Sequence, residues 1–316
     1  MLCGAVWRCC TAGAGVSSMR EIVIISGKGG TGKTSVTASF AVLANGAVIA
    51  DCDVDAADLH LVLEPQVQER HAFYAGQVAV IRAPDCSGCG ACLAHCRFDA
   101  VTMQGTAAGA ATFAIDRLAC EGCGVCVRGC PVHAIDFPER LCGAWMVSAT
   151  RCGPLVHAQL DAGAGNSGKL VAQVRAVARR IAERDQHALI IVDGPPGIGC
   201  PVIASLSGAT QVLIVSEPTV AGAHDLARVL ALTRHFRIPT AVCVNKWDLS
   251  PAMTQQIEDT ARQAGASVAG RIRYDRGVTQ AQLQARAVVE IATASAEDIR
   301  HVWDSLSNLP KQTTHA

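Results

Sequence analysis

Residues 21–34 read Glu-Ile-Val-Ile-Ile-Ser-Gly-Lys-Gly-Gly-Thr-Gly-Lys-Thr, and a helical pattern continues over residues 35–44. The first six residues form a largely β-branched apolar run, which predicts a buried strand. The next eight fit G-x-x-x-x-G-K-T between a strand and a helix, the setting that this motif requires. Glycines let backbone N–H groups turn toward phosphate oxygens there, and the helix N-terminus adds its positive end. The sequence therefore predicts a phosphate-binding loop.

Each residue type in this loop has its own expected role. We expect Lys33 to reach the β- and γ-phosphates of a nucleotide and the Thr34 hydroxyl to bind Mg²⁺. The glycine-rich backbone is expected to surround the phosphates. The expected nucleotide-binding residues are Gly27, Gly29, Gly30, Thr31, Gly32, Lys33, Thr34 and, after a later strand, Asn245.

The chain from residue 20 onward alternates between strand and helix patterns. Short apolar runs rich in β-branched residues occur at 22–25, 47–50, 189–192, 212–215 and 241–244. Helical patterns cover residues 35–44, 169–184, 224–235 and 253–264. Continuously apolar strands separated by helices are typical of a parallel sheet covered on both faces. We therefore predict an α/β fold of the P-loop NTPase type, with a mostly parallel sheet.

A second near-match to the phosphate motif lies at residues 163–169, which read Gly-Ala-Gly-Asn-Ser-Gly-Lys. Leu170 stands where the motif has its metal-binding Ser or Thr. Residues 157–162 are not read as a buried strand, so the required setting is missing. We predict a flexible loop and a helix start here.

Composition excludes several classes of protein. Half of the 316 residues are hydrophobic and 17% are charged, which permits a large core and argues against a disordered chain. Lys and Arg number 27, as do Asp and Glu, and aromatic residues make up only 4%. Nucleic-acid binding usually needs a basic excess and stacking side chains, so it is not expected. No apolar run reaches the length of about 18 residues that a membrane span needs.

The number of cysteines, 16, is unusually high. Disulfide-rich secreted proteins are usually short and begin with a signal peptide, and residues 1–18 lack that pattern. Zinc and iron–sulfur sites remain as explanations. Either one indicates a reducing compartment, so a cytoplasmic location is expected.

The spacing of the cysteines distinguishes between zinc and iron–sulfur sites. Residues 86–96 carry C-x2-C-x2-C-x3-C, and residues 120–131 carry the same pattern followed by Pro131. This is the cysteine run of bacterial ferredoxins, present twice. Structural zinc usually takes two separated C-x2-C pairs. The pattern favours two [4Fe–4S] clusters, with zinc as the alternative.

In such two-cluster proteins the fourth cysteine of each run binds the other cluster. One cluster would be held by Cys86, Cys89, Cys92 and Cys130, and the other by Cys120, Cys123, Cys126 and Cys96. The first run departs from the pattern, because Arg97 follows Cys96 where proline is usual. A positive charge beside a cluster should raise its reduction potential.

The loop K-G-G-T-G-K-T resembles the deviant phosphate loop of the MinD/ParA/Mrp family, to which the nitrogenase iron protein also belongs. The resemblance implies that Lys28 reaches the nucleotide of a partner subunit, and hence a nucleotide-dependent homodimer. It matches Asp53, within Asp51-Cys-Asp53, to the aspartate that orients the attacking water. It matches Asp193, at the end of the strand beginning at residue 189, to the aspartate that supports Mg²⁺. Lys28, Lys33 and Asp53 are the expected catalytic residues.

Residues 245–248 read Asn-Lys-Trp-Asp, the N-K-x-D form with which GTPases read guanine. In the MinD-like family an Asn at this strand end contacts adenine instead. The resemblance therefore favours ATP, while the Asp248 carboxylate leaves GTP open.

The resemblance covers residues 20 to about 300 and indicates an ATPase interrupted by a ferredoxin-like insert. We expect a discontinuous ATPase domain at 19–83 and 139–310, with the insert at 84–138 between Pro84 and Pro138. Residues 1–18 are expected to be an unstructured or wrongly assigned extension, with Met19 as the natural start.

Two functions fit these features. The first is ATP hydrolysis coupled to electron transfer through the two clusters to an unknown redox partner. The second is an ATP-dependent carrier or maturation factor for a cofactor or cluster, in which the bound clusters are structural or act as sensors.

Overall fold

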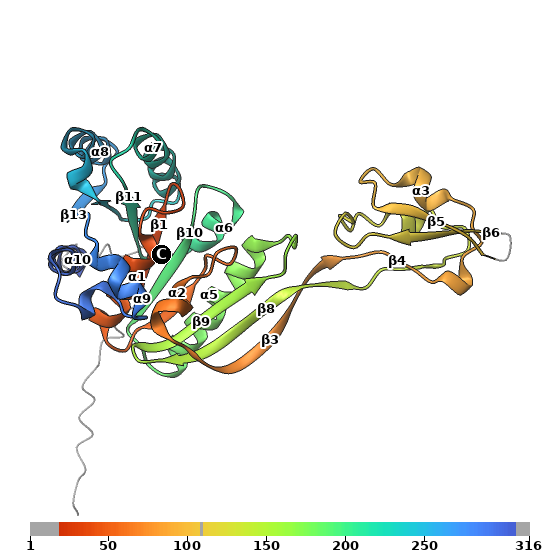
Figure 1. Cartoon of the computed structure of the whole chain (residues 1–316), viewed down its shortest axis with the longest axis horizontal. Helices are drawn as coiled ribbons and strands as arrows, with labels where there is room; N and C mark the ends of the chain where they lie inside the picture. Colours follow the sequence, from red (N-terminus) through yellow and green to blue (C-terminus); the bar gives the residue numbers. More distant parts are fainter. Residues whose placement is uncertain (1–18, 108–109, 308–316) are drawn as a thin grey trace, which may run out of the picture.

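A nine-stranded sheet forms the centre of the molecule, in the order β13-β12-β11-β1-β10-β2-β9-β8-β3 (Figure 1). The computed structural model describes residues 19–107 and 110–307. Strands β13 to β9 run parallel, and β8 and β3 continue the sheet in antiparallel pairing. The parallel strands are β1 (Arg20–Ser26), β2 (Val48–Asp51), β9 (Gly153–Leu160), β10 (Leu189–Pro196), β11 (Gln211–Ser216), β12 (Thr240–Asn245) and β13 (Ser267–Ile272). The predicted α/β fold with a mostly parallel sheet is confirmed.

Helices cover both faces of this sheet and bury alternate strand residues. Val23 and Ile25 face one layer of helices, whereas Ile22 and Ile24 face the other. The first layer contains α5 (Ser167–Arg184), α6 (Cys200–Leu206), α7 (Val220–His235) and α8 (Pro251–Gln263). The second contains α1 (Lys33–Ala44), α2 (Leu59–Leu63) and α10 (Ala294–Ser307), and α9 (Gly277–Leu283) lies nearby. Burial on both faces explains why these strands read as continuous apolar runs.

Sequence analysis missed a long antiparallel ribbon. Its strands are β3 (Gln66–Gln77) and β8 (Glu139–Thr150), and β8 also pairs with β9. The interpretation of residues 157–162 was wrong, because β9 runs to Leu160 and is buried from Leu155 to Ala158. Most β3 side chains are exposed, so this edge strand lacks the apolar pattern that reveals a buried one.

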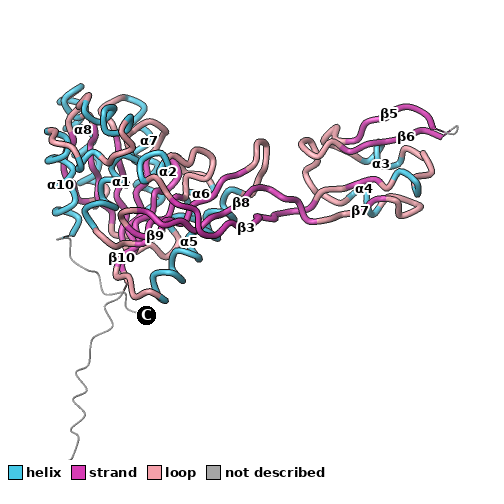
Figure 2. The backbone as a smooth tube through the Cα atoms, turned by 60° about the horizontal axis from the view of Figure 1, so that its bottom comes forward, coloured by secondary structure: helices cyan, strands magenta, loops and turns pink. Residues whose placement is uncertain are grey.

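The ribbon carries residues 78–138, the distal module, at its far end (Figures 1 and 2). Two small antiparallel sheets form this module, one of β4 (Val80–Ile81) with β7 (Ile135–Asp136), the other of β5 (Val101–Ala107) with β6 (Ala110–Ile115). Two short helices, α3 (Ala91–His95) and α4 (Val125–Arg128), complete it. The module has its own apolar cluster, and β4 lies before the boundary expected at residue 84.

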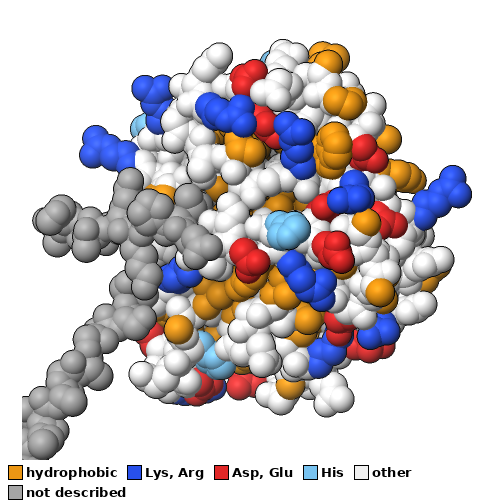
Figure 3. All heavy atoms as spheres, turned by 90° about the vertical axis from the view of Figure 1, so that its left-hand side faces the viewer, with side chains coloured by type: hydrophobic (Ala, Val, Ile, Leu, Met, Phe, Trp, Pro, Cys, Tyr) orange, Lys and Arg blue, Asp and Glu red, His pale blue; other side chains and the backbone are white. Residues whose placement is uncertain are grey.

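The expectations for residues 1–18, including Met19 as the natural start, fall outside the described residues. No helix within 19–107 and 110–307 is both long and apolar enough to cross a membrane. Figure 3 views the end of the molecule near α8 and α10, where basic and acidic side chains are interspersed. This mixed surface agrees with the balanced charge of the sequence.

A buried ion pair joins the first strand to the helix layer. Glu21, 2% exposed, accepts a hydrogen bond of 2.7 Å from Nε of Arg175, which is 4% exposed. Arg175 Nη1 also donates to the carbonyl oxygens of Ala204 (2.6 Å) and Ser207 (2.8 Å) at the C-terminal end of α6. One guanidinium thus joins β1, α5 and α6.

We predict that Glu21→Ala lowers the free energy of unfolding by about 3 kcal/mol or more, because Arg175 would become an unpaired buried charge. The urea midpoint, followed by circular dichroism, measures this change. Asp185→Ala is the control, since it removes an exposed pair with Arg184 that solvent already screens. Equal midpoints for the two variants would contradict the prediction.

Candidate nucleotide and cysteine sites

The phosphate loop lies between β1 and α1, where the sheet's parallel strands end. Gly32 precedes α1 with a φ of 89°, a left-handed conformation that favours glycine. Lys33 is the first residue of the helix and is only 6% exposed. The loop and helix start therefore have the arrangement that the motif predicts.

Lys33 is held between two carboxylates that sequence analysis had assigned to the site. Its Nζ lies 2.8 Å from Oδ1 of Asp193 and 3.3 Å from Oδ2 of Asp53. Burial opposes the lysine's charge, but these two carboxylates outweigh it and raise the pKa of Lys33. Burial raises the pKa of Asp53 despite the nearby ammonium. The three side chains come from separate segments and meet at one point.

Asp193 is the centre of a wider set of hydrogen bonds. The Thr34 hydroxyl donates to its Oδ2 (2.8 Å) and the Thr37 hydroxyl to its Oδ1 (3.0 Å). Asp193 is fully buried, and β10 continues three residues beyond it to Pro196, so it does not end its strand as expected. Strand pairing with β2 nevertheless stops at Asp193.

Asp51 shapes the neighbouring loop. Its Oδ1 accepts the N–H of Asp53 (3.2 Å) and its Oδ2 the N–H of Leu59 (3.3 Å), the first residue of α2. Burial and the nearby Asp193 raise the pKa of Asp51 well above its usual value. Asp51 therefore closes the loop that carries Asp53.

Lys28 points to a different carboxylate. It forms an ion pair with Glu217, and its Nζ lies 3.5 Å from Oγ1 of Thr219. Glu217 also pairs with Lys246 (3.3 Å), whose Nζ donates to the carbonyl of Gly30 (3.3 Å). These contacts lower the pKa of Glu217, although burial opposes the shift.

Asn245 and Asp248 separate in the structure. Asn245 Nδ2 donates to the carbonyl of Thr31 (2.7 Å), which fixes the end of β12 against the phosphate loop. It lines a cavity of about 280 Å³ with Gly32 and Tyr274. Asp248 is exposed, is not among the residues lining that cavity, and accepts the N–H of Tyr274 through Oδ1 (2.7 Å).

The cleft over the phosphate loop suits a phosphate group. It has a volume of about 450 Å³ and is lined by residues 29–35 with Asp53, Pro195 and Pro196. Thr31 is 3% exposed, and its hydroxyl has no hydrogen-bond partner among the described residues. A buried polar atom without a partner is costly, and a phosphate oxygen would satisfy it.

The first cysteine set converges in the distal module. Cys86, Cys89, Cys92 and Cys130 line one apolar pocket, closed by Phe113 and Ile135. Ala134 N–H donates to Cys130 Sγ (3.3 Å), and an N–H from Ala91 lowers the pKa of Cys89. Cys130 therefore joins the earlier triplet, as the crossed assignment expects.

The second set repeats this local geometry. Gly90 before α3 and Gly124 before α4 have φ values of 73° and 70°, so each triplet wraps around a matching turn. Burial raises the pKa of Cys126, and Cys120 and Cys123 are close enough to add to this shift. Cys96 packs against the module's apolar cluster, as do cysteines of both sets, Cys92 and Cys130 as well as Cys120 and Cys126. Among the described residues, no three His, Cys, Asp or Glu side chains converge on a single-ion site.

Two residues of the nucleotide site were missed in the sequence. Glu217 follows β11, and its position at the carboxyl end of a parallel strand was a usable signal. Thr37 carries no such signal, because only the fold brings its hydroxyl to Asp193. Lys169 of the second near-match is exposed and lies in the first turn of α5.

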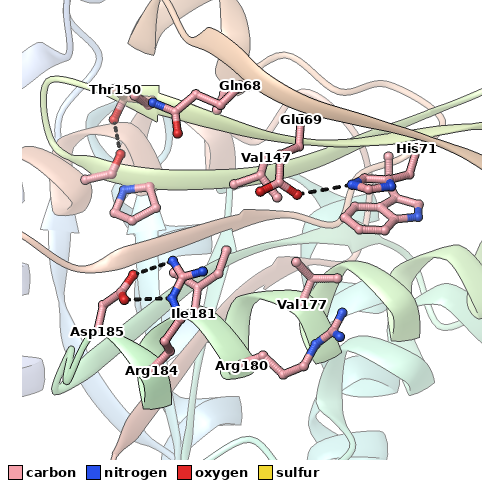
Figure 4. Close-up of a pocket in the computed structure, with 15 residues that line it drawn as sticks. Gln68, Glu69, His71, Val147, Thr150, Val177, Arg180, Ile181, Arg184 and Asp185 are labelled. Carbon is pink, nitrogen blue, oxygen red and sulfur yellow. Dashed lines mark hydrogen bonds and ion pairs between the residues drawn. The ribbon is translucent and has the colours of Figure 1, made fainter.

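A larger cavity, of about 730 Å³, lies apart from both sites, between the ribbon and α5 (Figure 4). His71 stacks on Trp145 with ring centroids 4.0 Å apart, and Glu69 pairs with His71. Arg180 and the Arg184–Asp185 pair extend from α5 on the other side. The β8 residues that line it still pair with β9, so the cavity lies on the core sheet and not on the free part of the ribbon.

Comparison with known proteins identifies the family. A model described as the CobQ/CobB/MinD/ParA nucleotide binding domain matches residues 22–288. The chain belongs to this family. It is a P-loop ATPase of the MinD/ParA type, and residues 22–288 form its nucleotide binding domain. Two uncharacterized proteins of Methanocaldococcus jannaschii are similar to it, with 34% identity over 229 residues (72% of this chain, 78% of the relative) and 24% over 264 residues (74% and 83%).

Solved structures show the same fold at low sequence identity. The cell division ATPase MinD of Pyrococcus furiosus has a TM-score of 0.54 at 17% identity, over 92% of this chain and 99% of that one. The septum site-determining protein MinD of Pyrococcus horikoshii, complexed with Mg-ADP, has a TM-score of 0.56 at 15% identity, over 92% and 96%.

We predict that Lys33→Ala weakens ATP binding by at least about 30-fold, because removing one member of a buried charge pair costs 2 kcal/mol or more. Lys169→Ala is the matched control from the second G-x-x-x-x-G-K run and should bind ATP normally. Isothermal titration with Mg-ATP measures both affinities. Normal binding by Lys33→Ala, or a comparable loss in Lys169→Ala, would contradict the assignment.

Proposed function

We propose that this ATPase couples ATP hydrolysis to electron transfer through two [4Fe–4S] clusters held in its distal module. The observation that carries the proposal is the convergence of Cys130 with Cys86, Cys89 and Cys92 in one apolar pocket. Four thiols from two distant runs share this pocket, as one cubane requires. A cytoplasmic location, where thiols stay reduced, fits this chemistry.

The nucleotide chemistry follows from the residues around Asp193. Lys33 would exchange its carboxylate partners for the β- and γ-phosphates, and Thr34 and Asp193 would support Mg²⁺. Asp53 would then be free to orient the attacking water. The backbone of residues 27–32 and the unpartnered Thr31 hydroxyl would surround the phosphates.

ATP rather than GTP is favoured by the positions of Asn245 and Asp248. A guanine-reading aspartate must direct its carboxylate to the base, whereas Asp248 accepts the Tyr274 N–H and does not line the cavity beside Asn245. Asn245 is fixed at that cavity by its bond to Thr31.

The distal module would hold the clusters with its own thiolates and backbone. Each cubane, when bound, accepts and releases one electron. Backbone N–H groups directed at sulfur, such as that of Ala134 at Cys130, stabilise the added negative charge. A donor of lower potential would supply the electron, and an unidentified redox protein would accept it.

Coupling is tested by measuring both cluster midpoint potentials anaerobically, by electron paramagnetic resonance, without nucleotide, with Mg-ADP and with a non-hydrolysable Mg-ATP analogue. A segment ordered by phosphate and Mg²⁺ is a two-state element that can shift the potential of a group attached to it. We expect at least one midpoint to move with the analogue. Superimposable titrations would contradict coupling, and a cluster that transfers readily to an acceptor would favour a carrier function.

We predict about eight irons per chain after anaerobic purification, in two cubane clusters. Cys96→Ala should damage the cluster on Cys120, Cys123 and Cys126 rather than that of its sequence neighbours, because the fourth ligands cross over. Iron analysis and Mössbauer spectroscopy measure this outcome. One mononuclear metal per chain would refute the cluster assignment.

We predict a nucleotide-dependent homodimer in which Lys28 leaves Glu217 and acts on the partner's phosphates. A second cation there stabilises transition-state charge, as an arginine finger does, and is worth about 10³-fold or more. Lys28→Ala and Lys33→Ala should each be inactive, and mixing them should restore one working site per mixed dimer. Absence of recovery on mixing would show that Lys28 does not act across the dimer.

A further inference from the structure

Residues 160–168, from the last residue of β9 to the first turn of α5, contact three parts of the molecule that the proposed function requires to communicate. This joining segment contains most of the second G-x-x-x-x-G-K near-match, for which the nucleotide site has no use. At its start, Leu160 N–H lies 3.5 Å from the carbonyl of Val54, the residue directly after Asp53. Its first turn is fixed to β8 by the Asp161 N–H, which donates to the Cys142 carbonyl (2.9 Å).

The other end of the segment lies against α6, which follows the Asp193 strand. A Cβ added at Gly168 would lie 3.4 Å from the backbone and Cβ of Cys200, the first residue of α6. Arg175 fixes α5 to the far end of α6 through Ala204 and Ser207. Helix α6 therefore contacts the first half of α5 near both of its own ends, so a movement of α6 would press on the joining segment.

The middle of the segment reaches the distal module through Arg140 of β8. Arg140 Nη2 donates to the carbonyl of Gly163 (3.4 Å), and its Nη1 donates to the carbonyl of Cys120 (3.4 Å). A Leu118 methyl also lies beside Gly163, since a Cβ there would be 3.6 Å from Leu118 Cδ2. One guanidinium thus bridges the ATPase core and a cysteine of the second set.

We propose that residues 160–168 and Arg140 transmit nucleotide binding to the distal module, and that the cluster on Cys120, Cys123, Cys126 and Cys96 is the one that responds. The choice of cluster rests on the proposed function, whereas the contact path itself does not. A guanidinium close to Cys120 stabilises the more negative, reduced state of that cluster. Displacing it changes the potential, because cluster potentials depend on local charge and hydrogen bonds.

Hydrogen exchange of the full chain, with and without a non-hydrolysable Mg-ATP analogue, tests the contact path. In the unmodified protein we expect changed exchange in residues 160–168 and also in residues 116–122. In Arg140→Gln, hydrogen exchange should still change in residues 160–168 but should no longer change in residues 116–122. Arg82→Gln is the matched control, because among the described residues the Arg82 side chain bonds to Asp85, Asp136 and His133, all in the distal module. Leu118→Ala shortens an exposed side chain and keeps Arg140. It should reduce the change in hydrogen exchange in residues 116–122.

Midpoint potentials of the same proteins identify the responding cluster. The Mg-ATP analogue should shift one cluster midpoint potential in the unmodified protein and in Arg82→Gln. In Arg140→Gln it should shift neither cluster's midpoint potential. A response in residues 116–122 that persists in Arg140→Gln, or no response there in the unmodified protein, would overturn the path. Equal shifts of both midpoints would overturn the choice of cluster. Iron analysis of each sample shows whether a variant has lost its clusters. If it has, hydrogen exchange still tests the contact path, because that measurement does not depend on bound clusters.

Discussion

The ion pair between Lys33 and Asp193 is the interaction around which the nucleotide site is built. The two residues are 160 positions apart, and only a parallel sheet with β1 beside β10 places a helix-start lysine 2.8 Å from a strand aspartate. Both are almost fully buried, so neither charge could persist without the other. Thr34, Thr37 and Asp53 add to the same pair. A phosphate that competes for Lys33 must therefore disturb every segment that meets at this point.

The ribbon is important because it extends the same sheet on which the nucleotide site is built. The sheet does not end at β2, where the loop that carries Asp53 begins, but continues through β9 and β8 into the ribbon that carries the cysteines. The main chain between Asp53 and Cys86, the first cysteine of the module, includes the 12-residue strand β3, which pairs with β8. Two strands that are hydrogen-bonded along their length transmit a displacement further than a flexible linker could. The architecture suits a protein in which two chemistries must influence each other.

Sequence alone predicts those sites whose chemistry requires particular residue types at short, fixed spacings. The phosphate loop and the cysteine quartets were predicted because each combines residue types with a fixed interval. Asp53 and Asp193 were predicted from the resemblance to the MinD/ParA/Mrp family. The ribbon was missed because β3 is an exposed edge strand without an apolar pattern, and β9 because its pairing is set by distant partners. Thr37 and Glu217 were missed because their partners Asp193 and Lys28 lie 156 and 189 residues away. Arg140 was missed because its bond to Cys120 ends on a backbone carbonyl.

The proposed function depends on thermodynamic coupling between the nucleotide site and the clusters. Linkage requires that any effect of ATP on a cluster potential be returned as an equal effect of reduction on ATP affinity. The direct test is anaerobic calorimetric titration of the non-hydrolysable Mg-ATP analogue into fully oxidised and fully reduced protein. We predict dissociation constants that differ by about tenfold, the factor equivalent to a one-electron shift of about 59 mV. Equal dissociation constants in the two states would contradict it.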